Sequence, residues 1–305
     1  MLNEKSMFAT AYHPCYVLDL PEHHRFPMEK YDLLKAQLLH EGILATSDLF
    51  QPSPIEDHMV LRCHREEYLH ILKRGGWSRN EERRSGFPWS EALIRRERII
   101  MEGTRRCARI AAERGVAFNI AGGTHHAHSA HAEGFCLLND LAISAYDMID
   151  SGLDRILIID LDVHQGNGTA SITANEDRIF TFSMHGAGNY PMHKPESNLD
   201  IALKDGTDDQ EYLTLLEEAL DMIMAEFQPQ AVLYQCGVDV LATDKLGRLS
   251  LTLDGCKQRD RMVFEACRKQ GVGVACSMGG GYSEDIRTII RAHTNTFRQA
   301  VYCWS

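Results

Sequence analysis

Three features are missing from this sequence: paired cysteines, an excess of basic residues and a long apolar run. The nine cysteines are scattered from Cys15 to Cys303 without one C-x-x-C pair, which argues against a disulfide framework and a thiolate zinc finger. No run approaches the roughly 20 apolar residues of a membrane span. The N-terminal stretch MLNEKSMFATAYHP lacks the basic-then-apolar layout of a signal peptide. We therefore expect a protein of the reducing cytoplasm.

The charge balance argues against two classes of partner. Lys and Arg number 32 against 43 Asp and Glu, which gives a net charge of -11. This charge repels phosphate backbones and anionic lipid, so we expect neither nucleic acid nor membrane as a partner. An acidic surface attracts cationic substrates such as lysine-bearing peptides or polyamines only weakly. The sequence does not indicate an oligomeric state.

A chain of 305 residues, 44% of them hydrophobic, is long enough to bury a sizeable core. No linker-like stretch interrupts it, so we expect one domain over residues 1–305. Short apolar runs alternate with longer helical patterns, which predicts an α/β fold with an open, mainly parallel sheet and helices on both faces. The expected strands are Ala117–Ala121, Ile156–Ile159, Ile179–Phe182, Ala231–Leu233 and Val272–Cys276.

Three helices are expected between these runs, at Ser90–Ala112, Glu211–Phe227 and Gly255–Lys269. Ser90 is a suitable cap for the first of them. The charged run Glu81–Arg84 is interpreted as a solvated loop.

Polar and titratable residues follow every expected strand. Because the site of an open α/β sheet lies outside the carboxyl ends of its strands, these residues predict one shared cleft. They are His125 and His126, Asp160, Asp162 and His164, Ser183 and Met184, Asp239, and Tyr282 after three glycines.

The segment Asp160-Leu-Asp-Val-His164 predicts a metal site. In an extended backbone residues two apart share a side, so Asp160, Asp162 and His164 can converge. A buried ion pair is the plainer interpretation, but the further carboxylate of Asp239 makes such burial costly without a cation. Two oxygens and one nitrogen, with a position left for water, are typical of a catalytic zinc site, and iron(II) accepts the same ligand types. A two-metal ureohydrolase is disfavoured because Gly166 stands where a bridging carboxylate is needed.

The adjacent histidines and the glycine loop add chemistry to the predicted cleft. His125 and His126 follow a double glycine, so both can approach one bond. For the nearby His128 and His131 we favour structural or solvent-facing roles over a second metal cluster. Tyr282 ends the loop Gly279-Gly-Gly-Tyr282, and its phenol can donate to a developing oxyanion.

These residues resemble the histone deacetylase superfamily from about Tyr12 to Tyr282. The matching motifs are GGTHHAHSAHAEGFCLLNDLAISA, IDLDVHQGNGTA, QCGVDVLATDKLGRLSLT and GGGY. The opening segment Pro21–Tyr31 resembles bacterial deacetylases and the class IV branch more than class I enzymes. The resemblance implies an arginase/deacetylase-like three-layer fold.

The resemblance also implies the roles of individual residues. It implies zinc on Asp162, His164 and Asp239, with His125, His126 and Tyr282 as catalytic groups. It implies a structural potassium ion at Asp160 and Ser183, with backbone carbonyls of Asp162, His164 and Met184, and Asp160 as the residue that orients His125. Asn167 takes the place of a class I aspartate beside His126, which should make His126 less basic than in those relatives. The implied substrate channel uses Gly134, Phe135, Tyr190 and Gly280, and Arg25 lies near the family's internal acetate channel.

The predicted function is a zinc-dependent amidohydrolase that removes an acetyl or longer acyl group from an amine. The favoured substrate is an acyl-lysine, and the alternatives are an acetylpolyamine or a small acetylated metabolite. A catalytically inactive binding module on the same fold is the alternative from another class, but every expected catalytic position is filled.

Overall fold

The structure is a computed structural model, and it describes residues 8–304. Residues 1–7 and Ser305 lie outside the described residues, so part of the expected 1–305 domain and part of the N-terminal stretch lie there too. The described chain forms one eight-stranded sheet in the order β2-β1-β3-β8-β7-β4-β5-β6, and every strand pair is parallel. The strands are β1 Ala9–Ala11, β2 Leu49–Phe50, β3 Val116–Asn119, β4 Ile156–Asp160, β5 Ile179–Gly186, β6 Leu199–Leu203, β7 Ala231–Gln235 and β8 Gly273–Ser277.

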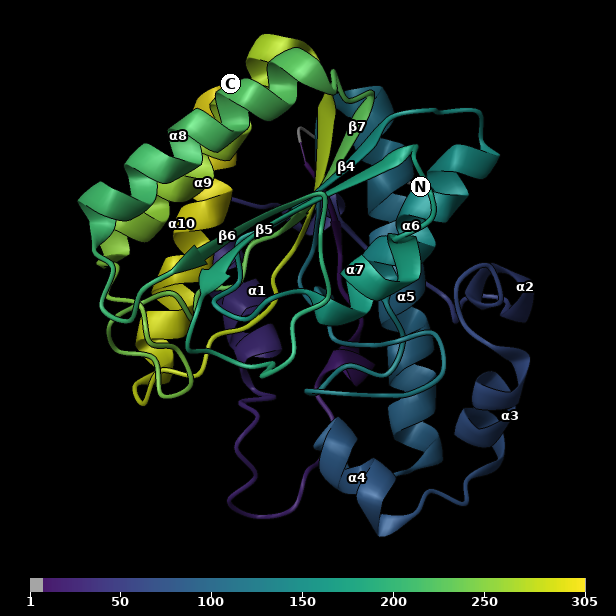
Figure 1. Cartoon of the computed structure of the whole chain (residues 1–305). Coiled ribbons are helices and arrows are strands. Elements are labelled where there is room, and N and C mark those ends of the chain that lie inside the picture. The colour runs from purple at the N-terminus through teal and green to yellow at the C-terminus, as the bar shows by residue number, and fades with distance from the viewer. Residues whose placement is uncertain (1–7, 305) are drawn as a thin grey trace.

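Helices cover both faces of this sheet, so the predicted three-layer α/β architecture is confirmed. In Figure 1, α8, α9 and α10 lie on one side of the sheet, and α5, α6 and α7 lie on the other. The α-helices are α1 Lys30–His40, α2 Asp57–Val60, α3 Glu66–Arg74, α4 Arg79–Ser85, α5 Glu91–Arg114, α6 Asp140–Asp150, α7 Asn167–Thr173, α8 Asp209–Glu226, α9 Leu253–Gln270 and α10 Ile286–Trp304, with short 3-10 helices at Pro14–Tyr16 and Thr46–Asp48. Among the described residues, no helix has the apolar length that a membrane span requires.

The hydrophobic core is divided by the sheet, because alternate strand residues point to opposite faces. In β7, Ala231 and Leu233 join the cluster that contains residues of α5 and α6, whereas Val232 and Tyr234 join the cluster with α8, α9 and α10. All five strand residues are buried, as expected for a parallel sheet covered on both sides. The near-continuous apolar runs of the sequence follow from this double coverage.

Two local predictions require correction. The run Glu81–Arg84 is helical, within α4, because Ser78 and Glu81 form a capping box: Ser78 Oγ accepts from the Glu81 N–H at 3.3 Å, and Glu81 Oε2 accepts from the Ser78 N–H at 2.6 Å. Ser183 and Met184 lie within β5, which continues to Gly186 because its neighbour β6 pairs with that end. The predicted cap at Ser90 is confirmed, since its hydroxyl accepts from the Leu93 N–H at 3.1 Å.

Candidate metal and acid-base site

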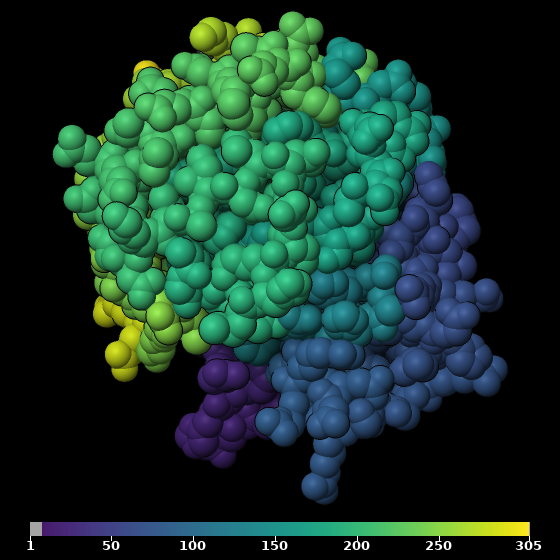
Figure 2. All heavy atoms as spheres, viewed as in Figure 1, coloured from purple at the N-terminus to yellow at the C-terminus, as the bar shows by residue number. Residues whose placement is uncertain are grey.

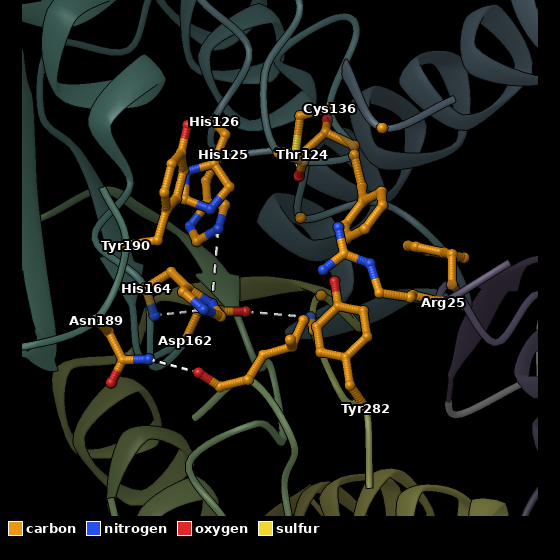
Figure 3. Close-up of a pocket in the computed structure, with 18 of the residues that line it drawn as sticks. Arg25, Thr124, His125, His126, Cys136, Asp162, His164, Asn189, Tyr190 and Tyr282 are labelled. Atoms are coloured by element: carbon orange, nitrogen blue, oxygen red, sulfur yellow. Dashed lines mark hydrogen bonds and ion pairs between the residues drawn. The ribbon is translucent and has the colours of Figure 1, made fainter. Parts of the chain in front are cut away.

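A cavity of about 500 Å³ opens at the carboxyl edge of the sheet, and its lining combines residues that follow separate strands. His125 and His126 follow β3, Asp162 and His164 follow β4, and Tyr282 follows β8. Figure 3 shows Asp162 and His164 between the tandem histidines and Tyr282. The parallel arrangement of all strands brings these groups to one edge.

Asp162, His164 and Asp239 form a compact three-ligand cluster. Their ligand atoms all lie within 4.8 Å of one another. His164 Nδ1 lies 3.0 Å from Asp162 Oδ1 and 3.2 Å from Asp239 Oδ2. Tetrahedral ligands at zinc distances of about 2.0–2.2 Å are separated by about 3.4 Å, so this spacing is suitable for one ion.

The hydrogen bonds of the two carboxylates leave one oxygen of Asp239 unsatisfied. Asp162 Oδ2 accepts from Gln235 Nε2 at 2.7 Å and from the Gly280 N–H at 3.1 Å. Asp239 Oδ1 accepts from the Val163 N–H at 3.0 Å, whereas the buried Oδ2 has no hydrogen-bond partner among the described residues. A buried carboxylate oxygen without a partner is costly. A cation beside His164 Nδ1 would remove this cost, so the residues fit a metal.

The protonation of the cluster leads to the same interpretation. Burial lowers the pKa of His164, but the adjacent carboxylates of Asp162 and Asp239 outweigh it and raise the pKa to about 10. Burial, followed by the charge of Asp162, raises the pKa of Asp239 to about 7. The cluster therefore retains protons that a divalent cation would displace.

The ring centres of His125 and His126 lie 4.0 Å apart, but the two rings have different hydrogen-bond partners. His125 Nδ1 lies 2.7 Å from Asp160 Oδ2, and this carboxylate overcomes burial to raise the pKa of His125 to about 9. His126 Nδ1 lies 2.6 Å from Asn167 Oδ1, and burial with the neighbouring positive imidazoles holds the pKa of His126 well below its ordinary value. An amide oxygen can only accept, so His126 carries its proton on Nδ1 and has a free lone pair on Nε2.

Glu133 binds the amide that faces His126, and no sequence pattern indicated this role. Its Oε1 accepts from Asn167 Nδ2 at 3.1 Å and from the Tyr190 hydroxyl. Because a carboxylate can only accept, the amide nitrogen of Asn167 faces Glu133 and the amide oxygen faces His126. His131 Nε2 lies 3.2 Å from Glu133 Oε2, and His128 Nε2 lies 3.1 Å from Asn167 Nδ2. These contacts give the two histidines hydrogen-bonding roles around Glu133 and Asn167. His128, His131 and Glu133 also form a half-buried group whose ligand atoms lie within 4.8 Å of one another, so the second metal cluster stays an alternative.

The loop that carries Tyr282 is held from two directions. The Tyr282 N–H donates to Asp244 Oδ2 at 2.6 Å, and Lys30 Nζ donates to the Gly279 carbonyl at 2.8 Å. Lys30 is buried, and its ammonium lies 5.6 Å from the centre of the Tyr282 ring. Figure 3 shows Tyr282 across the cavity from Tyr190. No sequence pattern connects Lys30 to this loop, because 249 positions separate the bonded residues.

Arg259 is a second buried cation that sequence reasoning missed. Its Nη1 donates to the carbonyls of Leu161 at 3.1 Å and Gly237 at 2.6 Å. Leu161 directly precedes Asp162, and Gly237 lies two residues before Asp239. Its charge is paired with Asp260 at 2.7 Å, and both side chains are fully buried. Arg259 therefore joins the two turns that present the carboxylate pair.

The predicted channel residues all line the cavity, as does Arg25. Phe135 packs against Tyr282 with ring centres 6.0 Å apart, and the Tyr190 ring lies 5.2 Å from that of His126. Two glycines let the backbone come close to site residues. At Gly134 a Cβ atom would lie 2.6 Å from the His126 ring, and at Gly280 a Cβ atom would lie 2.1 Å from Asp239 Oδ2.

The residues predicted around potassium are neighbours across two strands. Asp160 in β4 is in register with Ser183 in β5, and Met184 is the next residue of β5. Ser183 Oγ lies 3.0 Å from His185 Nδ1. At Gly166 a Cβ would lie 2.3 Å from Asp160 Oδ2, so the position lacks space for the carboxylate of a two-metal centre.

Comparisons with known proteins agree with this geometry. A histone deacetylase domain matches residues 24–298. The chain belongs to the histone deacetylase family. It is 41% identical to an uncharacterized protein of Picosynechococcus, over 96% of this chain and 98% of the relative. It is 28% identical to histone deacetylase 2 of Arabidopsis thaliana, over 98% of this chain and 80% of the relative.

The fold of this histone deacetylase family member also occurs in solved structures. The crystal structure of an HDAC homologue from Aquifex aeolicus matches with a TM-score of 0.83 at 23% identity, over 96% of this chain and 84% of that chain. Membership of the family supports a deacetylase hydrolase activity.

Proposed function

We propose that this protein is a zinc-dependent deacetylase whose Asp162, His164 and Asp239 hold the metal. The observation that carries the proposal is the unpartnered Asp239 Oδ2, which lies in a three-ligand cluster at a cavity with two histidines and a phenol. Zinc, when bound, polarises an acyl carbonyl and lowers the pKa of water. Iron(II) fits the same ligand types, so the test below compares both ions.

In the proposed reaction His126 is the general base. Its Nε2 accepts a proton from the attacking water, while Asn167 Oδ1 holds the Nδ1 proton in place. The water oxygen forms a bond to the acyl carbon, and His126, or the two histidines as a coupled unit, returns a proton to the amine as the C–N bond breaks. The products are a carboxylate and a free amine. His125, paired with Asp160, supplies electrostatic support.

Tyr282 is the proposed oxyanion donor, because its phenol projects into the cavity opposite His126 and its loop is anchored at Gly279 and Tyr282. Gly134, Phe135, Tyr190 and Gly280 form the proposed channel for the substrate's methylene chain. We also propose that a potassium ion is held by Asp160, Ser183 and backbone carbonyls, Met184 included. The adjacency of Asp160 and Ser183 supports this site for a hard cation.

The proposed substrate is an acyl-lysine, with an acetylpolyamine as the alternative. We also propose that the chain forms one catalytic domain, which the single sheet and its cavity support. Nine free cysteines support a reducing, cytoplasmic location.

The deciding experiment combines metal analysis with hydrolysis of an acetyl-lysine peptide. Chelated protein should be inactive and should regain activity with one equivalent of zinc or iron(II), whichever the site uses. Asp239→Ala should lose the tight metal and the activity together, because it removes one charged ligand of three. Full activity of Asp239→Ala after exhaustive chelation would contradict the proposal, and two tightly held manganese ions per chain would favour a ureohydrolase.

A further inference from the structure

The mouth of the cavity has the opposite charge to the rest of the protein. Among the described residues that line the cavity, the exposed charged side chains are all arginines: Arg25, Arg83, Arg84 and Arg248. The one carboxylate in the lining is Asp162, which is buried at the proposed metal. The chain as a whole carries a net charge of -11. The net negative charge of the chain therefore does not indicate the charge at the entrance of the cavity.

These arginines come from segments that are far apart in the sequence, and hydrogen bonds hold these segments together. His24 Nε2 lies 2.7 Å from the Gly86 carbonyl, which joins the segment of Arg25 to the end of α4. Figure 2 shows these two segments next to each other at one end of the molecule. Arg84 Nε donates to the Ala132 carbonyl at 3.0 Å. The cationic mouth is thus built into the fold.

Nearby acids only partly offset this charge. Arg248 Nη1 lies 3.2 Å from Asp205 Oδ2, and Glu133 accepts from Tyr190 at the side of the mouth. Arg96 also lines the cavity, but it is buried and paired with Glu97. Glu81 and Glu82 share α4 with the arginines but lie outside the lining, where they accept from the backbone N–H groups of Ser78 and Trp89. The lining itself therefore keeps a positive excess in a concave surface, where charge of one sign strongly affects the local concentration of charged ligands.

We infer that the protein acts on acylated amines whose remaining part carries anionic groups near the acylated nitrogen, and that it discriminates against polyamines. This inference rests on the proposed deacetylase function. With the acyl group at the metal, the remainder of the substrate lies at the mouth. A remote ammonium group is repelled there by the arginines, and a carboxylate is attracted. The charged part is supplied either by an acidic peptide around acyl-lysine or by a small acylated amino acid.

The test is a panel of acetyl-lysine peptides that differ only in flanking residues, which are Glu, Gln or Lys. Free Nε-acetyl-lysine and N-acetylputrescine complete the panel and distinguish peptides from small substrates. We expect kcat/KM to fall from Glu to Gln to Lys flanks by on the order of tenfold overall at low salt. The difference should shrink in 0.5 M NaCl, because salt screens exposed charges.

Reversing the charge of an arginine at the cavity mouth tests whether these arginines cause the preference among the peptides. Arg83→Glu should cancel or reverse the ranking. Arg155→Glu is the matched control. Arg155 directly precedes β4 and so lies at the amino ends of the strands, away from the cavity at their carboxyl ends, and this variant should leave the ranking unchanged. Higher activity on Lys-flanked peptide or N-acetylputrescine, or an unchanged ranking in Arg83→Glu, would overturn the inference. If no amide is hydrolysed, the proposed function fails, and fluorescence anisotropy of the same peptides still decides the charge preference.

Discussion

Replacing Arg259 with methionine should both lower the stability of the protein and weaken metal binding at the proposed site. The substitution removes the charge partner of Asp260, whose side chain is fully buried. Loss of one partner of a buried ion pair costs about 3–5 kcal/mol, a large fraction of the roughly 5–15 kcal/mol that stabilises a folded protein. It also removes the donor from the carbonyls of Leu161 and Gly237. The turns that present Asp162 and Asp239 then lose their common anchor.

A second substitution separates the two effects. Arg259→Met with Asp260→Asn leaves no unpaired charge, so it should recover much of the free energy of unfolding measured in urea. It cannot restore the anchor, so metal affinity, measured by competition with a chelator, should stay about 10- to 100-fold weaker. Arg261→Met is the control on the same helix, because Arg261 forms only a solvent-exposed pair with Glu265, and such pairs contribute little to stability.

Two outcomes would refute this reasoning. If Arg259→Met costs no more stability than Arg261→Met, the buried charge pair is not the stabilising feature. If the double variant binds metal as tightly as the unmodified protein, Arg259 does not position the ligands.

Three further predictions concern side chains at or near the cavity. Tyr282→Phe should lower kcat by about 100- to 1,000-fold while KM, melting temperature and metal content change little, whereas a packing role would lower the melting temperature alone. His126→Ala should slow single turnover more than His125→Ala at equal metal content, because it removes the proton carrier; the reverse order would exchange the two roles. Burial lowers the pKa of His64 from 6.5 to about 4, so between about pH 6.5 and pH 4 the unfolded chain binds a proton at His64 that the folded chain does not. The contribution of His64 to stability should therefore be about 2 kcal/mol smaller at pH 5 than at pH 7. Urea unfolding should show less of this loss in His64→Gln than in the exposed control His70→Gln, and equal losses would contradict the assignment.

The central strands were predictable from the sequence because they are buried on both faces. β4, β5, β7 and β8 each begin within one residue of the predicted start. The edge of the sheet was not predicted. β1 and β2 have only three and two residues, which is too short for a periodicity. β6 has a half-exposed alternation, as edge strands do, and its sequence lacks a continuous apolar run.

The site was predicted as a set of residues but not as a network. Strand-end positions indicated that Asp162, His164 and Tyr282 would meet, because parallel strands bring their carboxyl ends to one edge. The supporting contacts come from residues without a motif. Lys30 contacts Gly279, and Arg259 contacts Leu161, from positions 249 and 98 residues away. Such contacts depend on tertiary packing, which no local pattern reports.

The tandem histidines illustrate why chemistry depends on this network. Neighbours in sequence with identical side chains have opposite pKa shifts, because Asp160 faces one ring and Asn167 faces the other. Asp160 ends β4 and Asn167 begins α7, so the short connection between these elements sets both partners. Glu133 then fixes the orientation of the Asn167 amide, since a carboxylate cannot face the amide oxygen. The proposed division of labour between the two histidines therefore depends on the amide of Asn167 and the carboxylate of Glu133 behind it. Glu133→Gln can present an amide of its own to Asn167, so it should remove the constraint that keeps Nε2 of His126 free to accept a proton.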